Sequence, residues 1–337
     1  MRNLATLWRD TVNAYSDRVL VKWLNKKDIC EKTYGEMDAD ITKVRKGLAS
    51  LGYSASHIAL IGETSPYWIC CYFGIVTGDN VAVPLDANLP AEELIDLLNR
   101  SDSEALFISP KLEAVASAAK EKCPKLKNIW FLEEETEGKE TMATVMASAR
   151  DKDAKEPGED DVVTIIFTSG TTGKSKGVVL THRNLYDNVE NVEYVGKDNG
   201  TTLSVLPIHH AYCLVMDWLK TLSIGTTVCI NDSFMHMIRN MSIFNPSTML
   251  MVPMMIETIY KKLQVTKDPV SANVFGKNLE TIYTGGAHLD PFYIDEFAKY
   301  GIEVIEGYGM SECSPVISTN VKGKNKPGSI GKPLKNV

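Results

Sequence analysis

The regular alternation of short apolar runs with amphipathic segments constrains the fold of this chain more than any other feature. In the first 110 residues, helical patterns and strand-like runs follow one another at 34–51, 57–62, 65–77, 80–84, 90–99 and 105–108. Strands separated by helices at this interval form βαβ units, whose strands pair in parallel. The sequence therefore predicts an α/β fold.

A second series of the same kind follows a charged, weakly apolar segment at 133–161, which is typical of a solvated connection. Its main strands and helices are predicted at 162–167, 184–193, 202–206, 227–230, 248–252, 254–263, 281–284, 291–300 and 303–305. We expect two packed βαβ-type subdomains with largely parallel sheets, about 1–160 and 161–310, followed by the start of a smaller β-rich subdomain at 311–337.

Composition and charge exclude several classes of protein. Hydrophobic residues make up 44% of the 337 positions and charged residues 23%, as in globular proteins with a buried core. Lys and Arg number 36 against 43 Asp and Glu, and this deficit of positive charge disfavours nucleic acid as a partner. Seven cysteines without CxxC spacing indicate reduced thiols. Neither a signal-peptide pattern nor an apolar run of membrane-spanning length is found, so the predicted location is the cytoplasm.

The segment Thr168–Gly177, TSGTTGKSKG, carries the strongest chemical signal and lies between a predicted strand and a predicted helix. Its glycines allow close approach of the backbone to a ligand, its hydroxyls donate to oxygen or ligate Mg²⁺, and its lysines supply charge. The segment is not a P-loop, because Thr168 stands where that motif requires its first Gly. A solvated turn is the alternative, but this density of hydroxyls beside two lysines favours a loop that binds a polyphosphate.

With this loop the sequence resembles the adenylate-forming enzymes, which include acyl-CoA synthetases, luciferases and the adenylation domains of peptide synthetases. Their signature loop reads TSGTTG, any residue, Pro, Lys, Gly; the chain departs from it in Ser175, and Lys176 falls on the family lysine. Further segments resemble the family's motifs in the family's order: TYGEM at 33–37, GDNVAVPLDANLP at 78–90, LPIHH at 206–210, YTGGA at 283–287, EGYGMSE at 306–312 and PGSIGKP at 327–333. The resemblance extends over about the whole chain.

The resemblance implies that the carboxylate of an acid attacks the α-phosphate of ATP, which gives an acyl-adenylate and pyrophosphate. A thiol, usually that of coenzyme A, then takes the acyl group. ATP, Mg²⁺, coenzyme A and a small carboxylic acid are therefore the expected ligands. A fatty acid is the expected substrate, because His-His-Ala-Tyr at 209–212 is most similar to long-chain fatty acyl-CoA synthetases.

The resemblance also implies roles for individual residues. The β- and γ-phosphates are expected at Thr168, Ser169, Gly170, Thr171, Thr172, Gly173 and Lys176. Adenine and the α-phosphate are expected at Gly286, Ala287, Glu306, Gly307, Tyr308 and Ser311. Glu312 would bind Mg²⁺ together with Thr168, and the candidate catalytic residues are His210, Lys176 and Glu312. For His210, a residue that orients the substrate carboxylate and a satisfied structural histidine are equally good interpretations.

Two alternatives stay open. The first is an amino-acid or aryl-acid adenylation domain that feeds a carrier protein, although Asp217 is displaced from the place where such domains carry an Asp for the amino group. The second is a non-catalytic nucleotide-binding fragment, which Ser175 and the lack of a small C-terminal domain would favour. The family's hinge acid, catalytic lysine and ribose-binding Asp have no counterpart here, so we expect a large N-terminal domain truncated before the C-terminal one and poorly active as a ligase on its own.

Overall fold

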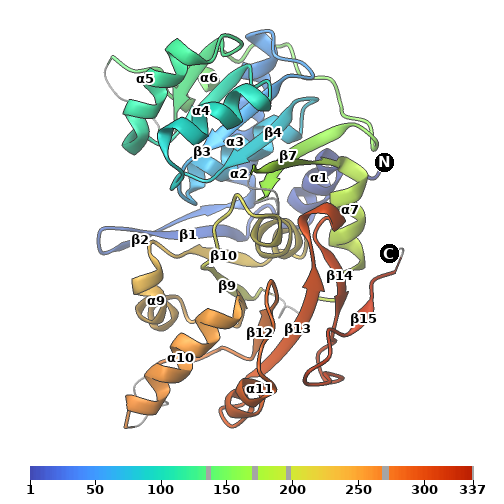
Figure 1. Ribbon diagram of the computed structural model, residues 1–337. Helices are drawn as coiled ribbons and strands as arrows, with labels where there is room; N and C mark the ends of the chain where they lie inside the picture. The colour runs from blue at the N-terminus through green and yellow to red at the C-terminus, as the bar shows by residue number, and fades with distance from the viewer. Residues whose placement is uncertain (134–137, 169–173, 195–198, 268–272, 336–337) are drawn as a thin grey trace. The chain divides into compact units, whose positions relative to one another are not determined.

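The protein is described by a computed structural model that covers residues 1–133, 138–168, 174–194, 199–267 and 273–335. The chain forms two units, each built on its own sheet (Figure 1). The first unit comprises Met1–Asn13, Tyr34–Tyr186 and Pro207–His210. The second comprises Ala14–Thr33, Asp187–Leu206 and Ala211–Val337.

The first unit contains a six-stranded sheet in the order β6-β5-β3-β4-β7-β8. Its strands are β3 (His57–Ile61), β4 (Val81–Leu85), β5 (Ala105–Ile108), β6 (Asn128–Phe131), β7 (Val162–Thr168) and β8 (Lys176–Thr181). Its helices are α2 (Tyr34–Ser50), α3 (Pro66–Val76), α4 (Ala91–Arg100), η1 (Pro110–Leu112), α5 (Glu113–Lys122) and α6 (Met142–Ala147), and α1 (Leu4–Tyr15) and α7 (His182–Asn191) begin in this unit. Neighbouring strands are parallel except for β8, which is antiparallel to β7.

The helices cover both faces of this sheet, as βαβ crossovers require. α4 places Leu94, Leu97 and Leu98 at helical spacing, and these residues pack with α5 on one face. α3 packs on β3 and β4 and against α2, on the opposite face (Figure 1). α3 begins where Ser65 accepts a hydrogen bond from the backbone N–H of Trp68 at 3.1 Å. The amphipathic pattern of the sequence thus becomes a three-layer core.

The second unit contains a nine-stranded sheet in the order β15-β14-β13-β12-β11-β9-β10-β1-β2. Its strands are β1 (Val19–Asn25), β2 (Asp28–Thr33), β9 (Thr201–Ser204), β10 (Thr227–Ile230), β11 (Thr248–Met251), β12 (Thr281–Thr284), β13 (Glu303–Gly309), β14 (Val316–Thr319) and β15 (Lys332–Pro333). Its helices are the π-helix η2 (Cys213–Lys220), α8 (Thr221–Ser223), η3 (Phe234–His236), α9 (Met237–Phe244), α10 (Pro253–Val265), α11 (Pro291–Ala298) and η4 (Ser311–Cys313). The run from β13 to β1 is parallel, and β2, β14 and β15 are antiparallel additions at the ends.

The predicted α/β fold with largely parallel sheets is confirmed, but the units are divided differently from the predicted boundary near residue 160. β7 and β8 complete the first sheet, because β7 pairs with β4 and the Thr164 hydroxyl donates to the Ala82 carbonyl at 2.9 Å. The hairpin β1–β2, from the start of the chain, joins the second sheet through β10. β14 and β15 extend that same sheet and do not begin a separate subdomain.

No helix in the described ranges combines the length and the apolar character that a membrane-spanning segment needs.

Candidate functional site

A β-hairpin brackets the predicted phosphate loop. Thr168, the last residue of β7, pairs with Lys176, the first residue of β8, so the two ends of the loop lie directly opposite each other. Thr168 is half-buried and Lys176 is exposed. The loop residues between them that the sequence singles out lie outside the described residues: Ser169, Gly170, Thr171, Thr172 and Gly173. The hairpin thus presents the Thr168 hydroxyl and the exposed side chain of Lys176 at the carboxyl end of β7.

Arg100 holds the far end of this loop, a role that the sequence did not reveal. Its guanidinium donates to the carbonyl of Ser175 at 2.5 Å and lies over the Phe167 ring at 5.6 Å. It also pairs with Asp96 one helical turn earlier, at 3.2 Å. Ser175 occupies the position where the family signature has Pro, and its carbonyl is fixed by this contact. The loop end is therefore anchored to α4 without the proline.

His210 lies in a turn after β9, where its backbone N–H donates to the Pro207 carbonyl at 3.2 Å. Its side chain is exposed. Burial of part of the ring lowers the pKa of His210 below its ordinary value, and the charge of Asp86 opposes that shift. A neutral imidazole at pH 7 can orient a carboxylate by a hydrogen bond without titrating, which is one of the two interpretations that the sequence leaves open for His210.

In the second unit, the two segments predicted around adenine lie side by side at the carboxyl ends of β12 and β13. A Cβ added to Gly285 would stand 3.2 Å from the carbonyl oxygen of Gly307, so the two backbones are in contact. Gly286 follows with φ of +83°, and both it and Ala287 are exposed. The Tyr308 side chain is 48% exposed, so its ring is not part of the hydrophobic core. Two exposed backbone segments and one exposed aromatic ring therefore lie at the same edge.

Glu306 has a structural contact that the sequence did not predict. It is buried, and its Oε2 accepts a hydrogen bond from the backbone N–H of Gly328 at 3.2 Å. Its carbonyl oxygen accepts from the backbone and side-chain N–H groups of Asn320, at 3.0 and 3.2 Å. One carboxylate oxygen thus binds the PGSIGKP segment to β13, and this explains what that motif does in the fold.

Two glycines allow the backbone to fold tightly here. A Cβ on Gly309 would stand 2.1 Å from the carbonyl oxygen of Pro315. Gly331 has φ of +81°, and a Cβ there would stand 2.0 Å from the carbonyl carbon of Thr319. These distances are shorter than any side chain tolerates, so both positions require glycine.

Ser311 and Glu312 begin the short helix η4, directly after the exposed end of β13. Glu312 is exposed, and no hydrogen bond or ion pair of its carboxylate is found among the described residues. Mg²⁺ in nucleotide sites is held by one or two carboxylates, with phosphates and water completing its shell. An unpaired carboxylate fits that requirement, and within the described ranges no three His, Cys, Asp or Glu side chains form a metal site of their own. Thr168, the other predicted ligand, belongs to the first unit.

Asp217 lies inside the second unit on the π-helix η2. Its side chain is 1% exposed, and its Oδ1 accepts from the Thr202 hydroxyl at 3.3 Å. Burial raises the pKa of Asp217 to about 7, and hydrogen bonds from Ser204 and Thr202 oppose the rise. A buried carboxyl that is partly protonated at neutral pH is poorly suited to binding an ammonium group.

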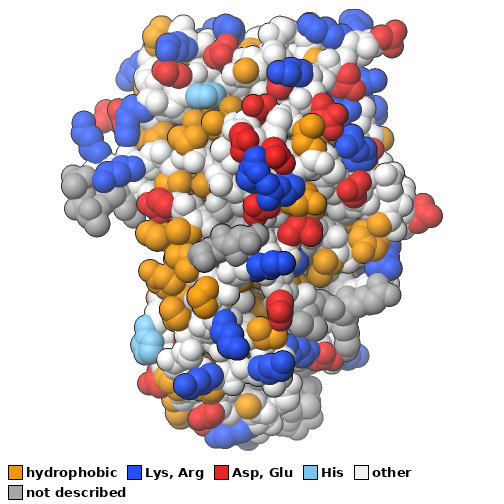
Figure 2. Space-filling model, turned by 90° about the vertical axis from the view of Figure 1, so that its right-hand side faces the viewer, with side chains coloured by type: hydrophobic (Ala, Val, Ile, Leu, Met, Phe, Trp, Pro, Cys, Tyr) orange, Lys and Arg blue, Asp and Glu red, His pale blue; other side chains and the backbone are white. Residues whose placement is uncertain are grey.

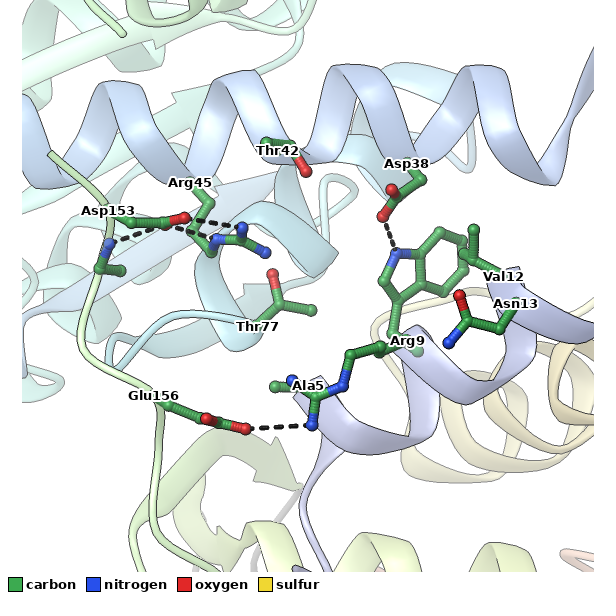
Figure 3. Close-up of a pocket in the computed structure, with 12 residues that line it drawn as sticks. Ala5, Arg9, Val12, Asn13, Asp38, Thr42, Arg45, Thr77, Asp153 and Glu156 are labelled. Atoms are coloured by element: carbon green, nitrogen blue, oxygen red, sulfur yellow. Dashed lines mark hydrogen bonds and ion pairs between the residues drawn. The ribbon is translucent and has the colours of Figure 1, made fainter. Parts of the chain in front are cut away.

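An open cavity of about 350 Å³ lies elsewhere in the first unit, along α1, α2 and residues 153–156 (Figure 3). Its charged side chains already have partners: Arg45 pairs with Asp153 at 2.8 Å and Arg9 with Glu156 at 3.2 Å, and Asp38 accepts a hydrogen bond from Nε1 of Trp8 at 2.7 Å. None of its lining residues is one that the sequence predicts for the site. We therefore assign it no part in ligand binding.

Figure 2 shows Lys and Arg side chains interspersed with Asp and Glu across the face in view. The chain as a whole carries a net charge of −7. An anionic ligand on such a surface is held by local groups and not by a broad positive field. Backbone N–H groups and a cation such as Lys176 are groups of that kind.

Comparison with known proteins identifies the family. The sequence profile of the family described as "AMP-binding enzyme" matches residues 8–337. The chain belongs to this family. The resemblance stated from the motifs is therefore confirmed.

Named relatives include ligases for fatty acids and for aryl acids. The chain is 27% identical to long-chain-fatty-acid–[acyl-carrier-protein] ligase AEE15 of Arabidopsis thaliana, over 97% of this chain and 58% of that protein. It is 24% identical to a long-chain-fatty-acid–CoA ligase of Bacillus subtilis, over 98% of this chain and 64% of the relative. It is 27% identical to a feruloyl-CoA synthase of an Amycolatopsis species, over 89% of this chain and 59% of that protein. The chain thus spans about three fifths of the length of these relatives.

Solved structures share the fold. The anthranilate CoA ligase AuaEII, in complex with anthranoyl-AMP, superimposes with a TM-score of 0.88 at 17% identity, over 99% of this chain and 64% of that chain. The inhibitor-bound N-terminal domain of FACL13 from Mycobacterium tuberculosis superimposes with a TM-score of 0.84 at 22% identity, over 99% of this chain and 83% of that chain. These values establish the α/β architecture of the AMP-binding enzymes for this chain.

Proposed function

We propose that this chain binds ATP and a carboxylic acid and joins them to an acyl-adenylate, which then passes its acyl group to the thiol of coenzyme A. In the first step a carboxylate oxygen bonds to the α-phosphorus as pyrophosphate leaves. In the second step the thiol sulfur bonds to the acyl carbon, AMP leaves, and the thiol proton is released.

One observation carries this proposal. Within each unit, the described motif residues that are assigned to nucleotide contacts lie at, or just beyond, the carboxyl ends of parallel strands. Thr168 ends β7, Gly286 follows β12 and Tyr308 lies near the end of β13. Ligands of α/β proteins bind at this edge of the sheet, where loops and strand ends leave backbone groups exposed. Core packing alone gives no reason for an exposed tyrosine and exposed glycines at these positions.

In the first unit, Lys176 would supply positive charge to the β- and γ-phosphates, and the loop that begins at Thr168 would supply hydroxyls and backbone N–H groups. Transfer at phosphorus needs positioning and neutralisation of charge more than it needs a protein nucleophile. His210 would hold the substrate carboxylate by a hydrogen bond from its neutral ring.

In the second unit, the exposed ring of Tyr308 would stack on adenine, and the backbone at Gly286 and Ala287 would border the base. The free oxygen of Glu306 would accept from the adenine amine, while its other oxygen keeps the bond to Gly328. Ser311 would donate to the α-phosphate. Glu312 would hold Mg²⁺, which would neutralise phosphate charge.

A fatty acid is the acid we favour, and an aryl acid is the main rival. The His-His-Ala-Tyr segment and the fatty-acid ligases among the relatives support the first, and the feruloyl-CoA synthase supports the second. Amino acids are disfavoured, because Asp217, the acidic residue of the 209–218 segment, is buried and has a pKa of about 7.

The test is pyrophosphate–ATP exchange by the chain with a panel of acids: dodecanoate, hexadecanoate, ferulate, anthranilate and a mixture of amino acids. We expect exchange that requires a fatty acid and is lost in Lys176→Ala, but not in Lys43→Ala, which removes an exposed lysine on α2. Exchange that only amino acids or aryl acids support would contradict the fatty-acid assignment. Absence of exchange with every acid, in a chain that binds ATP, would favour the non-catalytic nucleotide-binding protein.

A further inference from the structure

Asp86 lies at the same sheet edge as Thr168, the last residue of β7, and has no role in the proposed function. β4 and β7 are parallel neighbours, with Ala82 paired to Thr164. Four residues further along each strand come Asp86 and Thr168, so the register brings both to the carboxyl edge. The position is the one where α/β proteins place residues that contact ligands.

One oxygen of the Asp86 carboxylate accepts hydrogen bonds from Asn88, and the other lies near a histidine. Its Oδ1 accepts from the backbone N–H and from the side-chain N–H of Asn88, both at 2.9 Å. Its Oδ2 lies 3.7 Å from Nε2 of His209. The turn at Asn88 therefore fixes the carboxylate and leaves the second oxygen for the imidazole.

His209 has a buried ring nitrogen that needs a partner. Its side chain is 11% exposed, and its Nε2 is buried without a hydrogen-bond partner among the described residues. A buried polar atom left without a hydrogen bond is costly, so most such atoms find a partner. At 3.7 Å the carboxylate is within ion-pair range, and an approach of roughly 0.7 Å would form the hydrogen bond.

The ring of His209 supports the ring of His210. Their centroids are 4.2 Å apart and their planes are inclined by 51°. His210 is the exposed member of the pair, and His209 contacts both the His210 ring and, at 3.7 Å, the Asp86 carboxylate. Burial, and then the neighbouring ring of His210, lower the pKa of His209 to about 4, while Asp86 opposes the shift. Both rings are therefore neutral at pH 7, and each has one protonated nitrogen.

We propose that Asp86 and His209 are positioning residues: Asp86 sets the tautomer and orientation of His209, and the His209 ring in turn sets the orientation of His210, the group proposed to orient the substrate carboxylate. The inference rests on the proposed function. Asp86 accepts from Nε2–H of His209 and thereby selects that tautomer, and the packed His209 ring restricts the rotation of His210. Carboxylates that orient an imidazole in this way act on the reaction only through the imidazole.

The test uses the ¹⁵N shifts of the imidazole nitrogens in the histidine-labelled, ligand-free chain at pH 7.5, which distinguish the two neutral tautomers. The chain has six histidines, so His209→Gln and His210→Gln assign the two signals. In Asp86→Asn we expect the ¹⁵N pattern of His209 to change and that of His210 to shift with it, and Asp86→Glu to restore both. The matched control is Asp102→Asn, a surface Asp in the same unit whose φ of +53° asparagine also adopts.

The kinetic arm separates positioning from a structural effect. Asp86→Asn should lower kcat of acid-dependent pyrophosphate exchange about tenfold and leave KM for ATP within about twofold. Unchanged His209 and His210 shifts in Asp86→Asn, or an equal loss of kcat in Asp102→Asn, would overturn the proposal. If Asp86→Asn fails to fold, His209→Gln replaces it, and an unchanged His210 shift and kcat there would overturn the proposal equally.

The two arms keep this inference distinct from the proposed function. The ¹⁵N readout needs no activity, so coupled shifts support the positioning of His210 even when no acid supports exchange. Absence of exchange in the unaltered chain would contradict the proposed function alone.

Discussion

The buried carboxyl of Asp217 makes the stability of the protein depend on pH in a predictable direction. It lies within η2, is 1% exposed, and contacts the Thr202 hydroxyl at 3.3 Å and the Cys213 sulfur at 4.0 Å. Burial raises its pKa from the ordinary 3.8 to about 7. Asp217→Asn keeps the shape and an oxygen acceptor for Thr202, and it removes the ionisation.

The sign follows from proton binding. Between pH 4 and pH 7 the carboxyl is ionised in the unfolded chain and largely protonated in the folded chain, so the free energy of unfolding falls as the pH rises through this range. Each pH unit of that difference is worth about 1.4 kcal/mol, which amounts to about 4 kcal/mol over the whole window. Above pH 7 both states are ionised, and the contribution no longer changes.

Urea unfolding followed by circular dichroism at pH 5, 6, 7 and 8 measures this effect. Relative to the unaltered chain, Asp217→Asn should gain about 3 kcal/mol in free energy of unfolding between pH 5 and pH 8. Asp102→Asn, which changes a fully exposed carboxyl whose pKa is lowered by Lys125, should show no such gain. The reasoning would be refuted if the difference in free energy of unfolding between Asp217→Asn and the unaltered chain changed by less than about 0.5 kcal/mol from pH 5 to pH 8.

Three further predictions concern the site and its scaffold. Lys176→Ala should weaken Mg²⁺-ATP binding in calorimetry by about 1.5–3 kcal/mol, the worth of a charge-assisted contact, and unchanged affinity would remove Lys176 from the phosphate site. Tyr308→Ala should weaken AMP binding by about 1–3 kcal/mol through lost stacking, and equal binding by both folded proteins would exclude the ring from the adenine site. Gly331→Ala should cost roughly 3 kcal/mol or more in thermal unfolding, because its Cβ would collide with the Thr319 backbone. Gly323→Ala, also at positive φ but with open space around the Cβ, should cost only about 1 kcal/mol, and equal losses would show that the collision is relieved.

Local periodicity predicted the parallel core well, because each helix and strand there carries its own pattern. The strands at 105–108, 227–230 and 281–284 begin and end where the sequence indicates. The hairpin β1–β2 was missed, since its place in the sheet depends on pairing with β10, about 200 residues away. β8 was missed for a related reason. It is an edge strand with an exposed Val179, and its partner β7 comes before the Thr168–Gly177 segment, whose composition indicates a loop.

The candidate site shows the same division. Motif spacing led to the proposal of Lys176, Tyr308 and Glu312 as site residues, because each lies within a short segment whose chemistry is local. Arg100 and Asp86 could not be found in this way, since Arg100 reaches Ser175 from α4 and Asp86 meets His209 only once β4 and residues 207–210 come together. Contacts of this kind follow from the register of the folded sheet, which the local pattern does not encode.

The most direct test of the central claim is calorimetric binding of a non-hydrolysable dodecanoyl-adenylate analogue, with AMP as reference. Burial of four methylenes at about 0.8 kcal/mol each would by itself tighten binding more than a hundredfold. The account predicts that the analogue binds at least about a hundredfold more tightly than AMP, and that Tyr308→Ala weakens the binding of both ligands by the same factor. Affinity no higher than that of AMP, or binding of the analogue that is insensitive to Tyr308→Ala, would contradict it.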